Sequence, residues 1–370
     1  MTASARKPRR CFPGWSEVFL EGLFAGQARS LGSSGLQSCS MKLIAVGAGL
    51  SREEARTDST KPTAAQQGCR CRYNPAIPYY PTGFMRLDII DTAASESAAE
   101  GFTRIALGVE YKGSRYRGWQ RQASGVPSVQ QALEQALSKV ANEPISVVCA
   151  GRTDAGVHGC GQIVHFDTHA VRDERAWTLG TNFNLPHDIS VVWSRPMPAD
   201  FHARFKACAR RYRYVIYNDP IRPAHLAEEV TWNHRPLDVE RMAEAAQYLL
   251  GTHDFSAFRA SQCQAKSPIK HIHHLRVTRH GQMIVLDVRA TAFLHHMVRN
   301  IAGVLMTIGA GERPASWARE VLEGRNRREG GVTAHPYGLY LVQVEYPEEF
   351  QLPQRYIGPH FLTGYEALAD

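Results

Sequence analysis

The stretch AGRTDAGVHG, Ala150–Gly159, indicates a glycine-rich turn between two strand-like segments at 145–149 and 162–168. Its glycines allow another backbone or a ligand to approach closely. Asp154 stands near its centre and Arg152 lies two residues earlier. A carboxylate beside a cation stays ionised at neutral pH, as a nucleophile must. The pattern also fits an ordinary turn in which Asp154 bonds its own backbone. It matches neither GxGxxG nor a Walker motif.

Outward from this turn, the sequence alternates between strand and helix patterns. Thr103–Tyr111 has the period of a half-buried strand, and Ser128 with Gln131 resembles a helix capping box. Further strands are expected at 189–194, 211–217, 273–280, 283–289 and 339–344, and helices at 171–183, 238–250, 293–308 and 314–322. Strands in hairpin-like runs favour an α+β fold with an antiparallel sheet over a doubly wound fold.

The domain organisation follows from length and from a restart of the pattern near residue 200. A chain of 370 residues has room for about two domains and some surplus. We expect a mostly disordered basic extension at 1–84, a leader at 85–101, an N-terminal catalytic α+β half at 102–200, a C-terminal α+β half at 201–350 and a tail at 351–370.

The net charge of +8 is distributed unevenly. Residues 1–84 hold eleven basic and five acidic residues, so they carry +6 and the rest of the chain +2. Their composition cannot bury enough apolar area to offset the entropy of ordering. An over-extended start, with the natural beginning at or near Met85, is favoured over a transit peptide, against which Glu17 and Glu21 argue.

Apolar stretches and cysteines in the sequence bear on membrane association and on the cellular compartment. No apolar stretch approaches the ~20 residues of a membrane helix, so no membrane partner is expected. The eight cysteines are scattered without a CxxC pair. Isolated thiols are typical of a reducing compartment, and we expect a cytoplasmic location.

A second informative stretch is FHARFKACARRYRY, Phe201–Tyr214. Six basic residues and one acidic residue lie between 201 and 222, a local charge of +5, and aromatic residues alternate with the cations. Cations neutralise phosphates and rings stack on unpaired bases, so this stretch favours binding to RNA. The alternative is a solvated strand face beside core aromatics.

A third stretch, HHMVR at 295–299, opens the most apolar predicted helix. Arg299 in such a helix needs a buried or half-buried anion, and Asp154 is a suitable partner. Alternatively, Arg299 extends to solvent. The histidine pair, with three more histidines at 271–274, suggests a metal site. No carboxylate or thiolate completes a ligand set in the sequence, so we expect no metal and interpret these histidines as RNA-facing or surface groups.

In this order and spacing, the segments closely resemble the TruA family of tRNA pseudouridine synthases. The resemblance runs from about Phe102 to the tail near 358–362, and the extension 1–84 departs from it. The motifs that carry it are YKG at 111–113, GWQ at 118–120, GRTDAGVH at 151–158, FHARF at 201–205, RRYRY at 210–214, HHMVRN at 295–300 and GLYL at 338–341.

The resemblance implies two ferredoxin-like α+β halves that share an antiparallel sheet, with the active cleft between them. It implies an isomerase that converts uridine to pseudouridine at positions 38, 39 and 40 of the tRNA anticodon stem-loop. It also implies a homodimer in which one tRNA contacts both subunits, and chemistry without cofactor or metal. A chain beginning at Met85 is expected to keep full activity.

The resemblance also implies roles for four residues. Asp154 would be the nucleophile, with its point of attack (C1′, C6 or a ribose proton) left open. Tyr212 would stack on the uracil and help remove the C5 proton. Arg152 would help flip the base and fill the space left behind, and Arg299 would hold the carboxylate of Asp154. The residues that match tRNA-contacting regions are Arg172, Phe201, His202, Ala203, Arg204, Phe205, Gln262, Cys263, Gln264, Ala265 and Lys266.

Two other classes of function fit parts of the sequence. A non-catalytic RNA-binding or tRNA-chaperone module would explain the basic, aromatic stretch. It would not require a carboxylate between glycines at Asp154. A phosphate-transferring aspartate enzyme ranks last, because the sequence offers no magnesium site.

Overall fold

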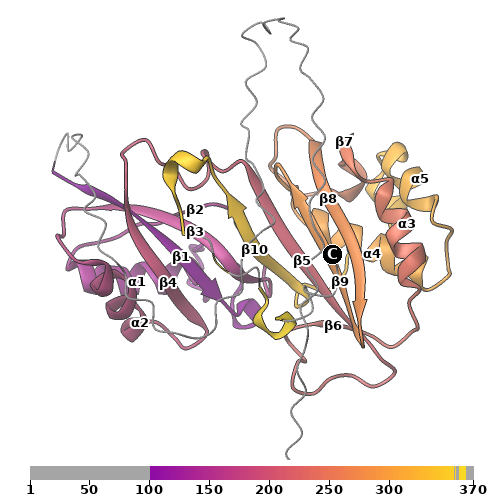
Figure 1. Cartoon of the computed structure of the whole chain (residues 1–370), viewed down its shortest axis with the longest axis horizontal. Coiled ribbons are helices and arrows are strands. Elements are labelled where there is room, and N and C mark those ends of the chain that lie inside the picture. Colours follow the sequence, from indigo (N-terminus) through magenta and orange to yellow (C-terminus); the bar gives the residue numbers. More distant parts are fainter. Residues whose placement is uncertain (1–100, 354, 356–357, 364–370) are drawn as a thin grey trace, which may run out of the picture. The chain divides into compact units, whose positions relative to one another are not determined.

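The computed structural model describes residues 101–353, 355 and 358–363 (Figure 1). All of these belong to one compact unit of the chain. The expected extension at 1–84, nearly all of the expected leader and part of the expected tail lie outside the described residues.

The described residues form one ten-stranded sheet in the order β4–β1–β3–β10–β5–β9–β8–β7, with β2 paired to β3 and β6 to β5. The strands are β1 (Thr103–Tyr111), β2 (Val148–Cys149), β3 (His158–Thr168), β4 (Ile189–Met197), β5 (Ala209–Asn218), β6 (Thr231–Asn233), β7 (Gly251–Asp254), β8 (Ile269–His280), β9 (Met283–Ala290) and β10 (Leu339–Glu345).

The expected antiparallel pairing is present, including the β8–β9 hairpin. β1 pairs with β3 and β4, and β9 pairs with β5 and β8, all antiparallel. The β8–β9 turn contains Gly281 at φ 59°, a conformation that glycine adopts without steric cost. Two pairings are parallel, β3 with β10 and β5 with β6. The last strand therefore lies between the first and second sets of strands and makes them one sheet.

Five α-helices occur in the described residues: α1 (Val129–Ala141), α2 (Thr181–Asn184), α3 (Val239–Gln247), α4 (Met297–Gly309) and α5 (Trp317–Gly324). A π-helical turn, η2, covers Ala176–Gly180, and shorter helical turns are η1 (Gly113–Arg115), η3 (Ser256–Phe258), η4 (Arg327–Glu329), η5 (Glu348–Phe350) and η6 (His360–Leu362). None of these described helices combines the length and apolar character needed to cross a bilayer.

The helix starts show which sequence signals were reliable. Ser128 Oγ accepts the Gln131 N–H at 3.3 Å, and Asp238 accepts the Arg241 N–H at 3.0 Å, as the capping patterns predicted. The helix expected from residue 171 starts later, after Asp173 accepts the Ala176 N–H.

The helix expected from residue 293 also starts later, at Met297. The reason is His296, which has φ 62° and cannot continue a right-handed helix. This break places His296 at the end of a loop and not inside the helix.

Two large apolar cores lie under the two ends of the sheet. One joins α1 and the β1–β3–β4 strands around Trp119 and Trp177. The other joins α3, α4 and α5 with β5, β8 and β9. Figure 1 shows α1 and α2 beside the β4 end and α3–α5 beside the β8 end. The site described next lies where the loop before β3 approaches β5 and the start of α4.

Candidate active site

Asp154 lies in the loop that joins β2 to β3, and hydrogen bonds brace this loop at Gly151 and Thr153, just before the carboxylate. Before it, Gln162 Nε2 donates to the Gly151 carbonyl oxygen at 2.6 Å. After that, Thr153 is held by its side chain and backbone. Its hydroxyl bonds the Tyr111 hydroxyl at 2.8 Å, and its carbonyl accepts the Trp119 N–H at 3.0 Å. The YKG and GWQ motifs therefore support the loop that carries Asp154.

Gly156 closes the loop in a conformation that favours glycine. It has φ 78°, and a β-carbon there would come within 3.0 Å of the Pro336 and Tyr337 side chains. The loop can therefore pack against the segment that precedes β10. The glycine pattern predicted a close approach by a backbone or a ligand, and at Gly156 the neighbours are two side chains.

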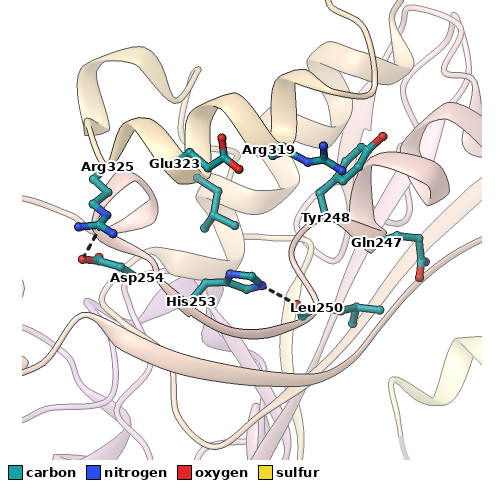
Figure 2. A pocket seen from close by; sticks show the side chains of 9 residues that line it. Gln247, Tyr248, Leu250, His253, Asp254, Arg319, Glu323 and Arg325 are labelled. Atoms are coloured by element: carbon teal, nitrogen blue, oxygen red, sulfur yellow. Dashed lines mark hydrogen bonds and ion pairs between the residues drawn. The ribbon is translucent and has the colours of Figure 1, made fainter.

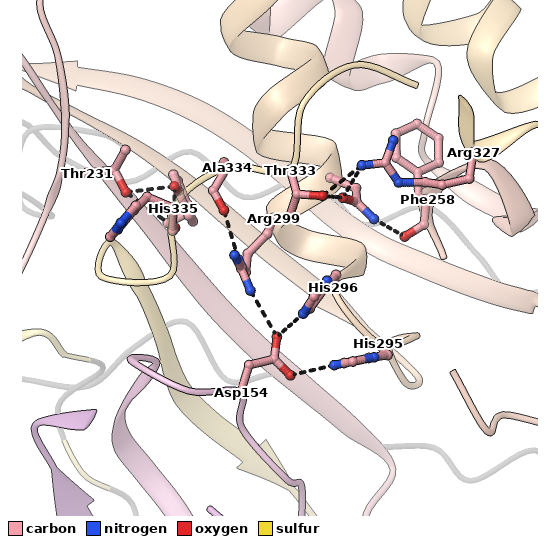
Figure 3. Close-up of polar contacts among 12 residues, drawn as sticks. Asp154, Thr231, Phe258, His295, His296, Arg299, Arg327, Thr333, Ala334 and His335 are labelled. Atoms are coloured by element: carbon pink, nitrogen blue, oxygen red, sulfur yellow. Dashed lines mark hydrogen bonds and ion pairs between the residues drawn. The ribbon is translucent and has the colours of Figure 1, made fainter. Parts of the chain in front are cut away.

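Arg299 is the cation that contacts Asp154 (Figure 3). Its Nη1 lies 3.5 Å from Asp154 Oδ2, and its side chain is 13% exposed. Its Nε donates to the Ala334 carbonyl oxygen at 2.8 Å. The expected pairing of Arg299 with Asp154 is therefore present. Arg152 is exposed, and the described contacts of the Asp154 carboxylate do not include it.

Two histidines complete the surroundings of the carboxylate. His295 Nε2 lies 3.2 Å from Asp154 Oδ1, and His296 Nε2 lies 3.4 Å from Asp154 Oδ2. Figure 3 shows both rings directed at Asp154. Burial lowers the pKa of His296, although the charge of Asp154 acts in the opposite direction. The interpretation of these histidines as RNA-facing or surface groups did not anticipate this contact.

The position of Asp154 beside the two histidines contradicts the reason given for expecting no metal, which was that no carboxylate completes a ligand set. Asp154, His295 and His296 each offer a ligand atom, and these atoms lie within 4.8 Å of one another. The sequence offered no carboxylate near the histidines, but folding brings Asp154 to them. Sequence spacing could not reveal this set because its members come from different halves of the chain.

Tyr212 lies on β5 beside the Asp154 loop. A methyl group at Gly151 would come within 3.8 Å of its hydroxyl oxygen. Its ring packs edge-on against Phe293 at 5.0 Å between centroids. Burial raises the pKa of Tyr212 well above its usual range, and the charge of Asp154 adds to this. Tyr212 is therefore a neutral, largely buried phenol at neutral pH.

The stretch 201–205 divides into buried and exposed members. Phe201 and Ala203 are fully buried, and His202 is half-buried. Arg204 and Phe205 are exposed, and the Arg204 guanidinium lies 5.7 Å from the centroid of the Phe205 ring. The side chains able to reach a ligand here are therefore mainly Arg204 and Phe205.

Part of the +5 charge at 201–222 is neutralised within the protein. Arg211 Nε and Arg213 Nε bond Asp287 Oδ1 and Oδ2 at 2.6 and 3.0 Å. Lys206 Nζ lies 2.8 Å from Asp200 Oδ2. Arg211 and Arg213 therefore pair with a carboxylate within the protein, but they do not form the solvated strand face of the alternative, because Arg213 is buried and Arg211 is half-buried.

The stretch 262–266 borders the site. Gln262, Gln264 and Lys266 are exposed. Cys263 Sγ accepts the His295 N–H at 3.4 Å, which connects this stretch to the histidine pair. Arg172, by contrast, is exposed beside α1, where its Nε donates to the Val140 carbonyl oxygen at 3.1 Å.

A separate cavity of about 400 Å³ lies between α3, β7 and α5 (Figure 2). Both of its arginines contact another residue of the lining. Arg325 Nε lies 3.8 Å from Asp254 Oδ2, and Arg319 lies over the Tyr248 ring at 4.2 Å. None of the residues that the sequence singled out lines this cavity.

Comparison with known proteins identifies the family. The chain matches the sequence model described as tRNA pseudouridine synthase over residues 108–206 and 245–347. It is 75% identical over 277 residues to tRNA pseudouridine synthase A of Pseudomonas aeruginosa, covering 75% of this chain and 97% of the relative.

Two further relatives agree. The proteins of the same description from Alcanivorax borkumensis and Actinobacillus succinogenes are each 60% identical, covering 70% of this chain and 97% and 98% of the relatives. The two segments that the family model spans include the Asp154 loop and the start of α4. The chain therefore belongs to the tRNA pseudouridine synthase family, isomerases that convert uridine in tRNA to pseudouridine.

Proposed function

We propose that this chain isomerises uridine to pseudouridine at positions 38, 39 and 40 of the tRNA anticodon stem-loop, with Asp154 as the nucleophile. The observation that carries the catalytic part is the carboxylate of Asp154, held by Arg299 in a braced loop beside Tyr212. The choice of positions 38–40 rests on the resemblance of the motifs.

The reaction breaks the bond between ribose C1′ and uracil N1 and joins C1′ to C5. N1 gains a proton, C5 loses one, and no water enters the product. A single carboxylate suits such a transfer, whereas glycosidases that admit water use two. The uridine must leave the base stack to reach Asp154.

Three neighbouring side chains support this chemistry. Arg299 is anchored at Ala334 and directs the Asp154 carboxylate. Tyr212 offers a ring for stacking on the uracil and lies beside the proposed nucleophile. Arg152 is exposed on the same loop as Asp154, so it can enter the RNA stack when the base is flipped.

The tRNA is proposed to contact exposed surfaces beside the site and, at Arg172, beside α1. These are Arg204 with Phe205, the stretch 262–266 and Arg172. A homodimer is proposed as well, and exposed apolar residues such as Val171 and Phe183, each 91% exposed, support an additional partner surface. Cys149, Cys160 and Cys263 are free thiols, which fits the proposed cytoplasmic location.

Release of tritium from C5-labelled uridine in an unmodified anticodon stem-loop tests the proposal directly. The wild-type chain should release tritium, and Asp154→Ala should abolish release while tRNA binding persists. Asp219→Ala is a matched control. Asp219 Oδ1 accepts the Ile221 N–H at 2.8 Å, as in the ordinary turn considered for Asp154. Full release by Asp154→Ala would refute the nucleophile, and binding by wild type without release would favour a non-catalytic RNA-binding module.

A further inference from the structure

The carboxylate of Asp154 and the two imidazoles of His295 and His296 have the composition of a transition-metal site. Two imidazole nitrogens and one carboxylate oxygen are a ligand set that Zn²⁺ and Ni²⁺ accept, whereas Mg²⁺ and Ca²⁺ prefer oxygen ligands. The three side chains are 23–36% exposed, so an ion in solution can reach them.

The distances fit an ion of this class. Zinc bonds of about 2.0–2.2 Å to nitrogen and oxygen place two ligands of a tetrahedron about 3.3–3.4 Å apart. His295 Nε2 and His296 Nε2 lie 3.2 and 3.4 Å from the oxygens of Asp154. The histidines face different oxygens, so an ion between the rings can bind either oxygen of the carboxylate.

The backbone holds this arrangement in place. His296 has φ 62° immediately before α4, and the rings of the adjacent histidines lie 4.1 Å apart between centroids. His295 is fixed on both sides of its backbone. Its N–H bonds Cys263 Sγ at 3.4 Å, and its carbonyl accepts the Ala260 N–H at 3.0 Å. Two neighbouring residues therefore direct their rings to one carboxylate.

We propose that Asp154, His295 and His296 bind a divalent transition-metal ion such as Zn²⁺, and that the bound ion inhibits the enzyme. Inhibition rests on the proposed role of Asp154, because a carboxylate bound to metal is not available as a nucleophile. Three protein ligands leave a position for water, so the site is not a closed structural zinc site.

Arg299 limits the strength of this site. Its Nη1 lies 3.5 Å from Asp154 Oδ2, and a like charge at that distance opposes a cation. The ion therefore competes with Arg299 for the carboxylate. Binding should be reversible by a chelator.

The test uses Co²⁺ as a spectroscopic probe and Zn²⁺ as the inhibitor, on the full chain. Co²⁺ should give the visible absorption of nitrogen and oxygen ligation at one equivalent per chain. Zn²⁺ should block tritium release, EDTA should restore it, and Mg²⁺ at the same concentration should have no such effect. The absorption is independent of catalysis, so it separates failure of this site from failure of the proposed function.

Variants assign the ligands. His296→Asn should raise the Zn²⁺ concentration for half-inhibition and the Co²⁺ dissociation constant at least about tenfold, as loss of a ligand contact does. Asparagine tolerates the positive φ at this position, so the fold should persist. His273→Asn is the control, because the rings of His273 and His271 also pack together, at 4.5 Å between centroids, but belong to no three-ligand group in the described residues.

Two results would overturn the proposal. If Co²⁺ produces no visible band, or if His296→Asn and wild type have the same Co²⁺ affinity, the three residues are not a metal site. If Co²⁺ binds through His296 but Zn²⁺ leaves tritium release unchanged, the inhibitory part is wrong.

Discussion

Arg299 and Ala334 exchange two hydrogen bonds, although they lie on different segments. Arg299 Nε donates to the Ala334 carbonyl oxygen at 2.8 Å, and Ala334 N–H donates to the Arg299 carbonyl oxygen at 3.1 Å. The guanidinium is thereby fixed through one edge, and its Nη1 remains directed at Asp154. The direction of the proposed nucleophile depends on the loop before β10 as well as on α4.

Arg299→Lys should lower kcat on the order of a hundredfold, as misplacement of a reacting group does. A lysine ammonium cannot bond Ala334 and Asp154 through one planar fork. Single-turnover tritium release measures the effect, and a filter-binding assay should give an unchanged affinity for tRNA. Equal kcat for Arg299→Lys and wild type would show that charge alone, without the anchor at Ala334, is sufficient.

Arg327 holds the loop that anchors Arg299. Its Nη1 donates to the carbonyl oxygens of Gly330 and Gly331 at 3.1 and 2.9 Å. Its Nη2 donates to Thr333 Oγ1 at 2.7 Å and to Asn300 Oδ1 at 3.0 Å, as Figure 3 shows in part. Arg327 thus joins the loop to α4 one residue after Arg299.

Arg327→Met should therefore lower kcat about tenfold or more while KM for tRNA changes little, because the loop and Arg299 become less well positioned. Steady-state kinetics on one tRNA substrate separates the two constants. Arg328→Met is the matched control, since Arg328 is exposed and adjacent. A rise in KM with constant kcat would mean that Arg327 supports tRNA binding and not the catalytic loop.

Local patterns in the sequence predicted most elements and the central pair of the site. The β8–β9 hairpin, the caps at Ser128 and Asp238, and the pairing of Arg299 with Asp154 each follow from a short pattern or from the cost of burying an unpaired charge. Each is a property of a few residues and their immediate environment.

Features that depend on distant segments could not be predicted in the same way. The parallel pairing of β10 with β3 is set by how the two sets of strands meet. The positive φ of His296 leaves no pattern in an apolar helical segment, and it is this φ that directs the ring at Asp154. The sequence of the basic strand β5 likewise does not reveal that Asp287, on β9, lies opposite Arg213.

Asp287→Asn should destabilise the fold by about 3–5 kcal/mol, the cost of removing one partner of a buried charge pair. Arg211 and Arg213 both bond this carboxylate, and Arg213 is buried. Burial by itself would raise the pKa of Asp287, but the two arginines hold it below its usual range. Urea unfolding at neutral pH measures the loss.

The exposed pair of Arg235 and Glu312 is the control for that experiment. Glu312→Gln should change the free energy of unfolding by less than about 1 kcal/mol, because exposed ion pairs contribute little. A similar loss in both variants would contradict a special role for the buried Asp287 cluster.

Phe205→Ala should weaken tRNA binding about tenfold, since stacking of a base on an aromatic ring contributes about 1–3 kcal/mol. Phe205 is 76% exposed and its ring lies beside Arg204 and His202. The logarithm of the tRNA binding constant should fall linearly with the logarithm of the salt concentration. Arg204→Ala should reduce the magnitude of this slope by about one, and Phe205→Ala should leave it unchanged.

Ile221→Ala provides the comparison for Phe205→Ala, because Ile221 is an apolar side chain with 74% exposure. It should bind tRNA as wild type does. If wild type, Phe205→Ala and Ile221→Ala bind tRNA with equal affinity, Phe205 is not part of the tRNA-binding surface.

The fold should become less stable as pH falls from about 6.5 to 4, because His158 is kept neutral in the folded chain. Burial lowers its pKa from 6.5 to about 4, and its Nδ1 accepts the Gly113 N–H at 3.1 Å, a bond that a proton on Nδ1 would break. In this range the unfolded chain binds a proton at this residue and the folded chain does not. Its contribution to stability is therefore complete above pH 6.5 and falls by up to about 1.4 kcal/mol per pH unit below it.

Urea unfolding at several pH values between 7.5 and 4 tests this for wild type and His158→Asn. The variant should be less stable at pH 7.5, because asparagine cannot reproduce the ring that stacks on Tyr340 at 4.6 Å. Its stability should nevertheless fall less steeply with acidification, because asparagine binds no proton. Parallel pH curves for the two proteins would mean that His158 is protonated equally in the folded and unfolded chains, and that its burial does not hold it neutral.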